Sequence, residues 1–281
     1  MRLHPKRLLK RLKPRTLLHL YILSTILWII QSTLLPHLLN PTSHLNGAST
    51  MTQIPSTLTN RTIQFLTAHP DDEVMFFTPI ITELLKAEHN NVLKLTCFSQ
   101  GNGAGLGSIR HDELYTSLRI LGFQQENIKL INDERKFKDS MSLSWDKRDI
   151  LAEIDEDTQV VITFDQGGVS GHPNHISLFN SAQEWLQVNE SKVVYVLKSW
   201  TLWEKYSSTL LTNYQLLARY LGYDSVSDPV SDSNFTVFAN LYDSLLGLTA
   251  MINGHYSQMV WFRWIWVTVS KYGNSNELVR L

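Results

Sequence analysis

The sequence has a single cysteine, Cys97, in 281 residues. One thiol cannot form an intramolecular disulfide, and it excludes a zinc site built on two or more cysteines. Cys97 lies in the apolar run Val92–Ser99, so we interpret it as a small buried side chain and not as a nucleophile. Metal chemistry in this chain would therefore depend on histidine and carboxylate ligands.

Charge is also missing from one long segment. No Lys, Arg, Asp or Glu occurs between Thr16 and Asn60. Within this segment, the apolar run Thr16–Leu39 would extend about 36 Å as an α-helix, sufficient to cross a bilayer with some tilt. A cleaved signal peptide is the alternative, although its apolar region is usually shorter. We predict a transmembrane helix at residues 16–39 and a flexible tether, rich in Ser, Thr, Asn and Pro, at residues 40–60.

The basic residues are unevenly distributed. The net charge of −1 argues against general nucleic-acid binding, yet residues 1–15 form a tail with seven Lys or Arg and no acidic residue. A basic tail before a transmembrane helix predicts a cytoplasmic amino terminus. By this rule the remaining chain lies on the other side of the membrane.

From residue 61 to residue 281 the sequence predicts one α/β domain, because short β-prone runs alternate with helix-like stretches. We expect a Rossmann-like, mostly parallel sheet with helices on both faces. Ligands of such sheets bind outside the carboxyl ends of the strands. The expected strands are Thr62–Thr67, Val92–Ser99, Asn127–Ile131, Val160–Phe164 and Val193–Lys198, and the expected helices are Met75–His89, Ile109–Leu121, Trp145–Ile154 and Asn174–Gln187.

The first motif, Ala-His-Pro-Asp-Asp-Glu at Ala68–Glu73, follows an expected strand. We expect a helix to begin here with Pro70 in its first turn. His69 and Asp72 would then share one helical face and reach one cation. Asp71 would point elsewhere and remain free as a base. The alternative is an acidic helix start without a metal.

The second motif, His-Pro-Asn-His at His172–His175, repeats this spacing after another expected strand. The preceding Gln166–Gly171 is typical of a flexible loop, and a pair of solvated histidines is the alternative interpretation. Taken together, His69, Asp72 and His175 form a two-histidine, one-carboxylate set with an open position. Such a set is typical of a catalytic zinc site.

This set predicts metal-assisted amide hydrolysis. Zinc lowers the pKa of a bound water from about 15.7 toward 7. Asp71 would accept the proton of that water as general base. His172 would stabilise the tetrahedral oxyanion or protonate the leaving amine.

A glycine-rich stretch, Gln100–Leu114, lies between the two motifs. It lacks the third glycine of the dinucleotide-binding pattern and the Gly-Lys of a P-loop. We expect a loop that lets the backbone approach a ligand, with Arg110 available to bind an anionic or polyhydroxylated group. The alternative is a surface loop in which Arg110 pairs with Glu113 or Glu134.

The segments Ala68–Glu73, Gly101–Glu113 and His172–His175, in this order and spacing, resemble the PIG-L/LmbE-like zinc deacetylases. The resemblance covers about Thr62–Leu281. The membrane helix, the His-Pro-Asn-His form and the aromatic carboxyl-terminal stretch resemble the eukaryotic branch, the N-acetylglucosaminylphosphatidylinositol de-N-acetylases of GPI-anchor biosynthesis. The resemblance implies removal of acetate from a glycolipid at the endoplasmic reticulum membrane.

By position, the resemblance implies the same metal ligands, Zn²⁺ or another divalent metal as cofactor, and the same roles for Asp71 and His172. It further implies substrate contacts by Arg110 and Asp139. It also places the catalytic domain on the cytoplasmic face, against the prediction from the basic tail. We follow the resemblance, because the substrate that it implies is made on that face.

Two points stay open. The stretch Met259–Val269 is too short to span a bilayer, and its tryptophans suit either a membrane interface or a buried core. The alternative functions are a type II membrane glycosyltransferase, a membrane-tethered glycan-binding protein with a structural metal, and a deacetylase of another GlcNAc-containing substrate. The histidine-rich second motif argues against the glycosyltransferase, because a diphosphate-bound metal needs few imidazoles.

Overall fold

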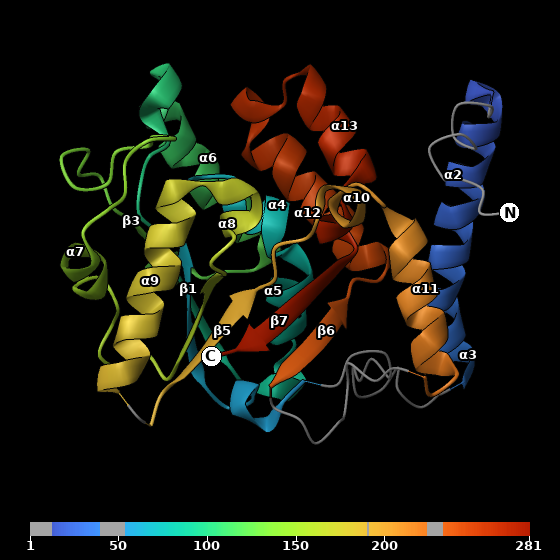
Figure 1. The fold of residues 1–281 in the computed structure, drawn as a ribbon, viewed down its shortest axis with the longest axis horizontal. Coiled ribbons are helices and arrows are strands. Elements are labelled where there is room, and N and C mark those ends of the chain that lie inside the picture. Colours follow the sequence, from blue (N-terminus) through green and yellow to red (C-terminus); the bar gives the residue numbers. More distant parts are fainter. Residues whose placement is uncertain (1–12, 40–53, 190, 224–232) are drawn as a thin grey trace, which may run out of the picture.

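The computed structural model describes residues 13–39, 54–189, 191–223 and 233–281. In these residues a seven-stranded sheet has the order β3-β2-β1-β4-β5-β7-β6 (Figure 1). Five neighbouring strands, β3 to β5 in that order, run parallel, which confirms the predicted fold class. The strands are β1 (Thr62–Thr67), β2 (Val92–Cys97), β3 (Ile128–Leu130), β4 (Val160–Phe164), β5 (Val193–Leu197), β6 (Asn234–Phe238) and β7 (Ser275–Arg280).

The sequence did not predict β6 and β7. Both add to the sheet in antiparallel pairs, β5 with β7 and β7 with β6. The β7 sequence, Ser-Asn-Glu-Leu-Val-Arg, has three polar residues at its start. Inside the fold these polar groups find partners: Glu277 accepts from Lys198 at 2.7 Å, and the Asn276 amide donates to the Phe76 carbonyl at 2.8 Å.

Helices cover both faces of the sheet (Figure 1). The helices α7 and α9 pack together on one face, and α5, α6 and α12 pack together on the other. Their bounds are α4 (Asp72–Phe76), α5 (Thr78–Leu84), α6 (Gly107–Leu121), α7 (Lys147–Leu151), α8 (Gly168–Gly171), α9 (Pro173–Val188), α10 (Leu202–Lys205), α11 (Thr209–Tyr220), α12 (Leu241–Gly254) and α13 (Trp261–Val269).

The single helix expected over Met75–His89 was wrong. The chain forms α4, breaks at Phe77, forms α5 and ends in a 3-10 turn at Ala87–His89. Pro79 explains the break, because it lacks the N–H that a continuous helix needs and instead occupies the first turn of α5. The break separates a short helix that carries motif residues from a longer helix that packs in the core.

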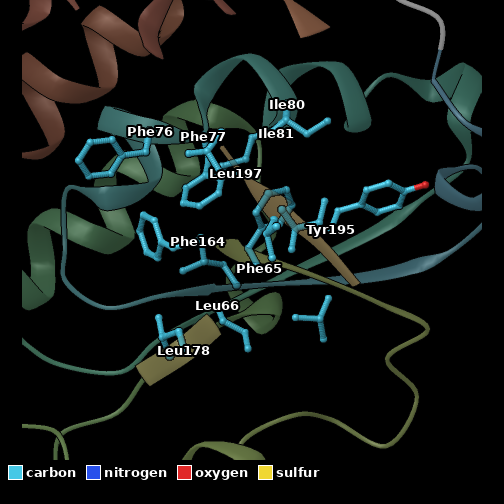
Figure 2. Close-up of a cluster of buried hydrophobic side chains, with 14 of the residues drawn as sticks. Phe65, Leu66, Phe76, Phe77, Ile80, Ile81, Phe164, Leu178, Tyr195 and Leu197 are labelled. Atoms are coloured by element: carbon cyan, nitrogen blue, oxygen red, sulfur yellow. The ribbon is translucent and has the colours of Figure 1, made fainter. Parts of the chain in front are cut away.

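Aromatic side chains link the sheet to the motif helices. The ring of Phe77 packs edge-on against Phe65 of β1 and Phe164 of β4, with centroid distances of 5.9 and 5.1 Å (Figure 2). Phe164 also stacks on His175, with centroids 3.8 Å apart and the rings nearly parallel. The core therefore contacts a motif histidine directly.

Cys97 is fully buried, as predicted, and burial raises the pKa of its thiol.

The amino-terminal segment is one continuous helix, made of α2 (Pro14–Ile29), a π-helical turn (Ile30–Leu34) and α3 (Leu35–Leu39). By length and composition it could cross a membrane. It also packs on α11, where Ser24 contacts Thr209 at 2.8 Å and accepts from the Asn213 amide at 2.8 Å. Most of the expected tether, residues 40–53, lies outside the described residues.

Candidate metal centre

Two neighbouring strands deliver the two motifs to one place. β1 and β4 pair in parallel, and the strand order reverses between them, so their carboxyl ends flank a topological switch point. His69 follows the end of β1 by two residues, and the second motif follows the end of β4 after the short turn α8. The structure thus brings together segments about 100 residues apart.

His69, Asp72 and His175 form a buried group whose nearest ligand atoms all lie within 4.8 Å of one another. Asp72 Oδ2 lies 3.3 Å from His175 Nε2 and 3.7 Å from His69 Nδ1. Burial raises the pKa of Asp72, but the nearby His175 and His69 outweigh it, and the pKa is well below its usual range. The proposed ligands therefore converge, with the carboxylate ionised.

The geometry of the first motif differs from the expectation. Helix α4 begins at Asp72, so His69 and Pro70 precede it and share no helical face with it. The residues converge because the Asp72 side chain turns back and accepts from the backbone N–H groups of Ala68 and His69, each at 2.9 Å. The predicted position of Pro70 in a helical turn was wrong, although the ligand atoms still meet.

His175 supplies the strongest indication of a cation. Its Nδ1 donates to the Gly168 carbonyl at 3.1 Å, so in the neutral ring Nε2 carries the lone pair. This Nε2 is buried, has no hydrogen-bond partner, and lies 3.3 Å from Asp72 Oδ2. A neutral imidazole nitrogen and a carboxylate oxygen buried in contact are costly unless a proton or a metal ion lies between them. Two imidazoles and one carboxylate match the ligand types and open coordination of catalytic zinc.

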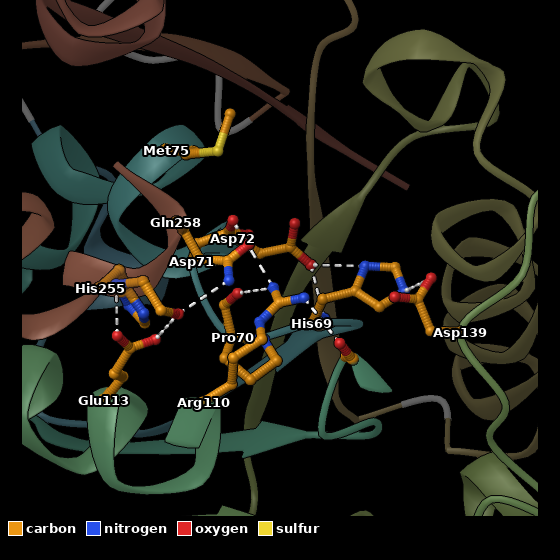
Figure 3. A network of polar contacts seen from close by, with 12 residues as sticks. His69, Pro70, Asp71, Asp72, Met75, Arg110, Glu113, Asp139, His255 and Gln258 are labelled. Atoms are coloured by element: carbon orange, nitrogen blue, oxygen red, sulfur yellow. Dashed lines mark hydrogen bonds and ion pairs between the residues drawn. The ribbon is translucent and has the colours of Figure 1, made fainter. Parts of the chain in front are cut away.

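A second group shares one residue with the first. His69, Asp139 and His172 also have ligand atoms within 4.8 Å of one another. His69 Nε2 lies 3.3 Å from Asp139 Oδ1 (Figure 3). It also lies 3.1 Å from Asn174 Oδ1. The Asp139 and His172 side chains are 24% and 18% exposed, against 4% and 6% for Asp72 and His175. The second group therefore faces the open side of the site.

His172 caps α9, which begins at Pro173, one residue before the expected start at Asn174. Its Nδ1 accepts from the Asn174 backbone N–H at 3.3 Å, so a neutral ring carries its proton on Nε2. Burial, together with the neighbouring His69 and His175, lowers the pKa of His172 to about 4. His172 is therefore a neutral hydrogen-bond donor at neutral pH.

Asp71 is held apart from the metal-binding group. Its φ of 105° lies in the left-handed region, which is strained for a residue with a side chain. Its Oδ2 accepts from Arg263 at 2.8 Å and lies 3.6 Å from Arg110. Burial raises the pKa of Asp71, the two guanidinium groups lower it in part, and the net shift is upward. Such a carboxylate suits a general base.

Arg110 does not pair with Glu113 or Glu134, so that alternative was wrong. Its guanidinium donates to the Gly101 carbonyl at 2.8 Å and to the Pro70 carbonyl, which ties the glycine-rich loop to the first motif (Figure 3). Glu113 instead accepts from Ser257, and Glu134 accepts from Asn102.

The sequence analysis missed Arg263. This residue lies on α13, and its guanidinium contacts both Asp71 and the sulfur of Met75. On the outer face of α13, Trp261 is 75% exposed and Trp264 is 49% exposed. The tryptophans of this stretch were expected to suit either a membrane interface or a buried core. Helix α13 has features of both, because Arg263 covers the first motif and other aromatic rings point outward. A lone arginine within an aromatic run was the available signal.

A buried ion pair beneath the first motif was also missed. Glu73 and His255 are both fully buried, and His255 Nε2 lies 2.5 Å from Glu73 Oε1. Ser117 of α6 donates to the same oxygen at 2.7 Å. Burial lowers the pKa of His255, but the Glu73 carboxylate outweighs it, and the pKa is raised. This pair ties α4 to the end of α12 and to α6.

The chain is similar in sequence to proteins of one enzyme family. Residues 64–186 match the family profile described as PIG-L: GlcNAc-PI de-N-acetylase. A probable N-acetylglucosaminyl-phosphatidylinositol de-N-acetylase from Schizosaccharomyces pombe is 34% identical over 223 residues, covering 78% of this chain and 86% of the relative. The corresponding protein of Bos taurus is 38% identical over 224 residues, covering 76% and 81%. The chain belongs to the PIG-L family.

A solved structure supports the same fold for this PIG-L family member. The N,N'-diacetylchitobiose deacetylase from Pyrococcus horikoshii has a TM-score of 0.50 and 18% identity, covering 79% of this chain and 84% of that one. The profile segment includes every site residue expected from the sequence, from His69 to His175. Arg263 and His255 lie beyond it and reach the first motif through tertiary contacts.

The ion pair beneath the motif generates a prediction about stability. We expect Glu73→Gln to lower the free energy of unfolding by about 3–5 kcal/mol at acidic pH, because it leaves a buried imidazolium unpaired. The pKa of His255 is raised from its ordinary value of 6.5 in the folded protein. The stabilisation by the pair is therefore complete below pH 6.5 and is lost as the pH rises through the folded-state pKa of His255. Denaturant unfolding of the full chain in detergent at acidic and alkaline pH measures the difference.

The matched control is Glu184→Gln, which removes a carboxylate that is 41% exposed and paired with Lys147. We expect it to change stability by less than about 1 kcal/mol. Equal losses for the two variants, or a loss for Glu73→Gln that grows with pH, would contradict the assignment of a buried ion pair.

Proposed function

We propose that this protein hydrolyses the N-acetyl amide of N-acetylglucosaminylphosphatidylinositol, an early step of GPI-anchor biosynthesis. The observation that carries the proposal is the buried lone pair of His175 Nε2 facing Asp72 Oδ2, with a separate carboxylate and a neutral histidine beside it. A structural metal site would not need the two additional groups. Membership of the PIG-L family and the names of the relatives support the substrate.

In the proposed mechanism, His69, Asp72 and His175 hold a divalent metal, zinc in our assignment. When bound there, the metal would acidify a water molecule and polarise the amide carbonyl. Asp71 takes a proton from the attacking water and returns it to the leaving amine. Arg263 keeps the Asp71 carboxylate in place and favours its ionised form through their contact at 2.8 Å.

The remaining groups stabilise charge and orient the substrate. His172 directs its Nε2–H toward the open side of the site, where it donates to the oxyanion of the tetrahedral intermediate. The low pKa of His172 favours this role over protonation of the amine. Asp139, partly exposed beside His172, accepts from a sugar hydroxyl group. Arg110 keeps the glycine-rich loop beside the first motif and contacts the substrate from there.

We further propose that the protein is a single-pass membrane protein of the endoplasmic reticulum with the catalytic domain on the cytoplasmic face. The anchor is the helix at residues 14–39, which is long and apolar enough to cross a bilayer. The family assignment does not favour the glycosyltransferase alternative. A deacetylase of another GlcNAc-containing substrate is separated from our proposal by assay with the glycolipid itself.

Metal removal tests the reaction. We expect purified full-length protein in mixed micelles to release free amine from N-acetylglucosaminylphosphatidylinositol. A chelator should abolish this activity, and added Zn²⁺ should restore it, because no other electrophile is proposed for the carbonyl. Metal content and amine release are measured on the same samples. Full activity in protein shown to be free of metal would refute the mechanism.

The two adjacent carboxylates should separate by role. We expect Asp71→Asn to lower kcat by about 10²–10⁴-fold while metal content is retained, because Asp71 is the base and not a ligand. Asparagine is chosen because it tolerates the left-handed conformation. Asp72→Asn, the matched variant, should lose the metal as well as the activity. Comparable metal loss in both variants, measured by elemental analysis, would contradict the division.

Membrane orientation is tested with glycosylation reporters on the full chain. We expect a reporter fused after Leu281 to remain unglycosylated in microsomes, because a cytoplasmic domain does not meet the luminal transferase. A reporter at the amino terminus is the control, and it should be glycosylated if the helix spans the membrane. Efficient glycosylation of the carboxyl-terminal reporter would overturn the cytoplasmic assignment.

A further inference from the structure

An apolar cavity of about 190 Å³ lies between α2, α12 and α13, away from the metal-binding group. Among the described residues, no Asp, Glu, Lys, Arg or His lines it. We call it the α2–α12 groove. Its main walls are the side chains of Trp28, Val74, Leu245, Leu248, Met251 and Trp266.

The groove lies where the domain meets the candidate membrane helix. Trp28 of α2 forms one wall and is almost fully buried, whereas Leu245 and Leu248 on the α12 side are 51% and 36% exposed. The helices that wall the groove also expose large apolar side chains. They include Leu23 and Leu27 of α2 and Ile265 of α13, all more than 40% exposed. The groove is therefore built from helices whose exposed side chains suit contact with lipid.

The charges of the two domain helices are turned away from this surface. The sequence of α12 contains one charged residue, Asp243, which is buried and caps the helix through Asn240. The sequence of α13 contains one, Arg263, which contacts Asp71. A carbohydrate would need several hydrogen-bonding partners in a site, and this groove offers few. An extended hydrocarbon chain matches its lining.

The groove is also close to the reaction centre. Val74 on its floor is two residues after Asp72 on the short helix α4. Trp266 packs edge-on against Phe76 with centroids 5.8 Å apart, and Phe76 packs against His175 at 6.0 Å. Two ring contacts therefore connect the groove wall to a proposed metal ligand.

We propose that the α2–α12 groove binds one acyl chain of the glycolipid substrate. This inference rests on the proposed function and names the lipid part of the same substrate. A chain in the groove would hold the headgroup beside the catalytic site at the membrane surface. We assign the groove to the substrate and not to bulk phospholipid, because its floor belongs to α4, which carries Asp72, and one wall belongs to α13, which contacts Asp71.

The first test fills the groove. Leu248→Trp places a larger side chain on its exposed rim, and Leu217→Trp is the matched control, since Leu217 is an exposed leucine of α11 outside the lining. The substrates are N-acetylglucosaminylphosphatidylinositol with long acyl chains and its water-soluble deacylated form. We expect Leu248→Trp to reduce the ratio of kcat/KM values, lipid over soluble, by about tenfold, because several methylene groups lose their burial. Leu217→Trp should keep the wild-type ratio.

A second test uses the unmodified full chain, so it does not depend on folding of a variant. Glycolipid substrate with a photoreactive diazirine in its acyl chain is irradiated with the protein in micelles, and labelled peptides are identified by mass spectrometry. We expect labelling at Leu248, Met251 or Trp266 that unlabelled substrate suppresses. Photoreactive phosphatidylcholine is the probe for bulk lipid.

The outcomes separate the two proposals. An unchanged ratio for Leu248→Trp, labelling elsewhere, or equal labelling by phosphatidylcholine that substrate does not suppress would overturn the acyl-chain assignment. If wild-type protein deacetylates both substrates in those cases, the proposed function stands without the groove. Failure of the wild-type protein to deacetylate either substrate would overturn the proposed function instead.

Discussion

One carboxylate oxygen, Asp72 Oδ2, determines the arrangement of the metal centre. The backbone N–H groups of Ala68 and His69 hold it at the end of β1, and the sheet fixes those groups in turn. The neighbouring strand β4 brings His175, whose Nε2 faces the same oxygen at 3.3 Å. Because a buried acceptor pair is costly without a cation, the folded backbone favours the bound metal that hydrolysis would use.

The second constraint is the separation of two consecutive acidic residues. Asp71 and Asp72 would repel each other if their carboxylates shared one space. The left-handed backbone at Asp71 turns its side chain toward Arg263, 192 residues later in the sequence. The helix that supplies this arginine also exposes Trp261 and lines an apolar groove with Trp266. The proposed base and the proposed lipid-binding groove are therefore connected through α13.

The sequence predicted the parallel strands, and it predicted that His69, Asp72 and His175 would converge as candidate metal ligands, because both follow from local patterns. Apolar β-prone runs mark the buried strands, and His69 and His175 stand close after the ends of two of them. The helix expected over Met75–His89 spans Pro79, whose missing N–H ends one helix and suits the start of the next. The alternative that Arg110 pairs with Glu113 or Glu134 was wrong, because those carboxylates are near in sequence, whereas the backbone carbonyls of Gly101 and Pro70 are nearer in space. Strand β7 depends on a distant partner for its polar side chains.

The sequence alone determined the candidate ligand types, their order and their places at strand ends, and it carried the specific motifs of the PIG-L family. Tertiary structure decided how the two acidic residues separate, which nitrogen of His175 bonds the Gly168 carbonyl, and which distant residue contacts the proposed base. The physical reason is that hydrogen-bond direction and burial depend on neighbours across the fold. Gly168, Arg263 and His255 act on the two motifs only after the sheet and its helices have brought them together.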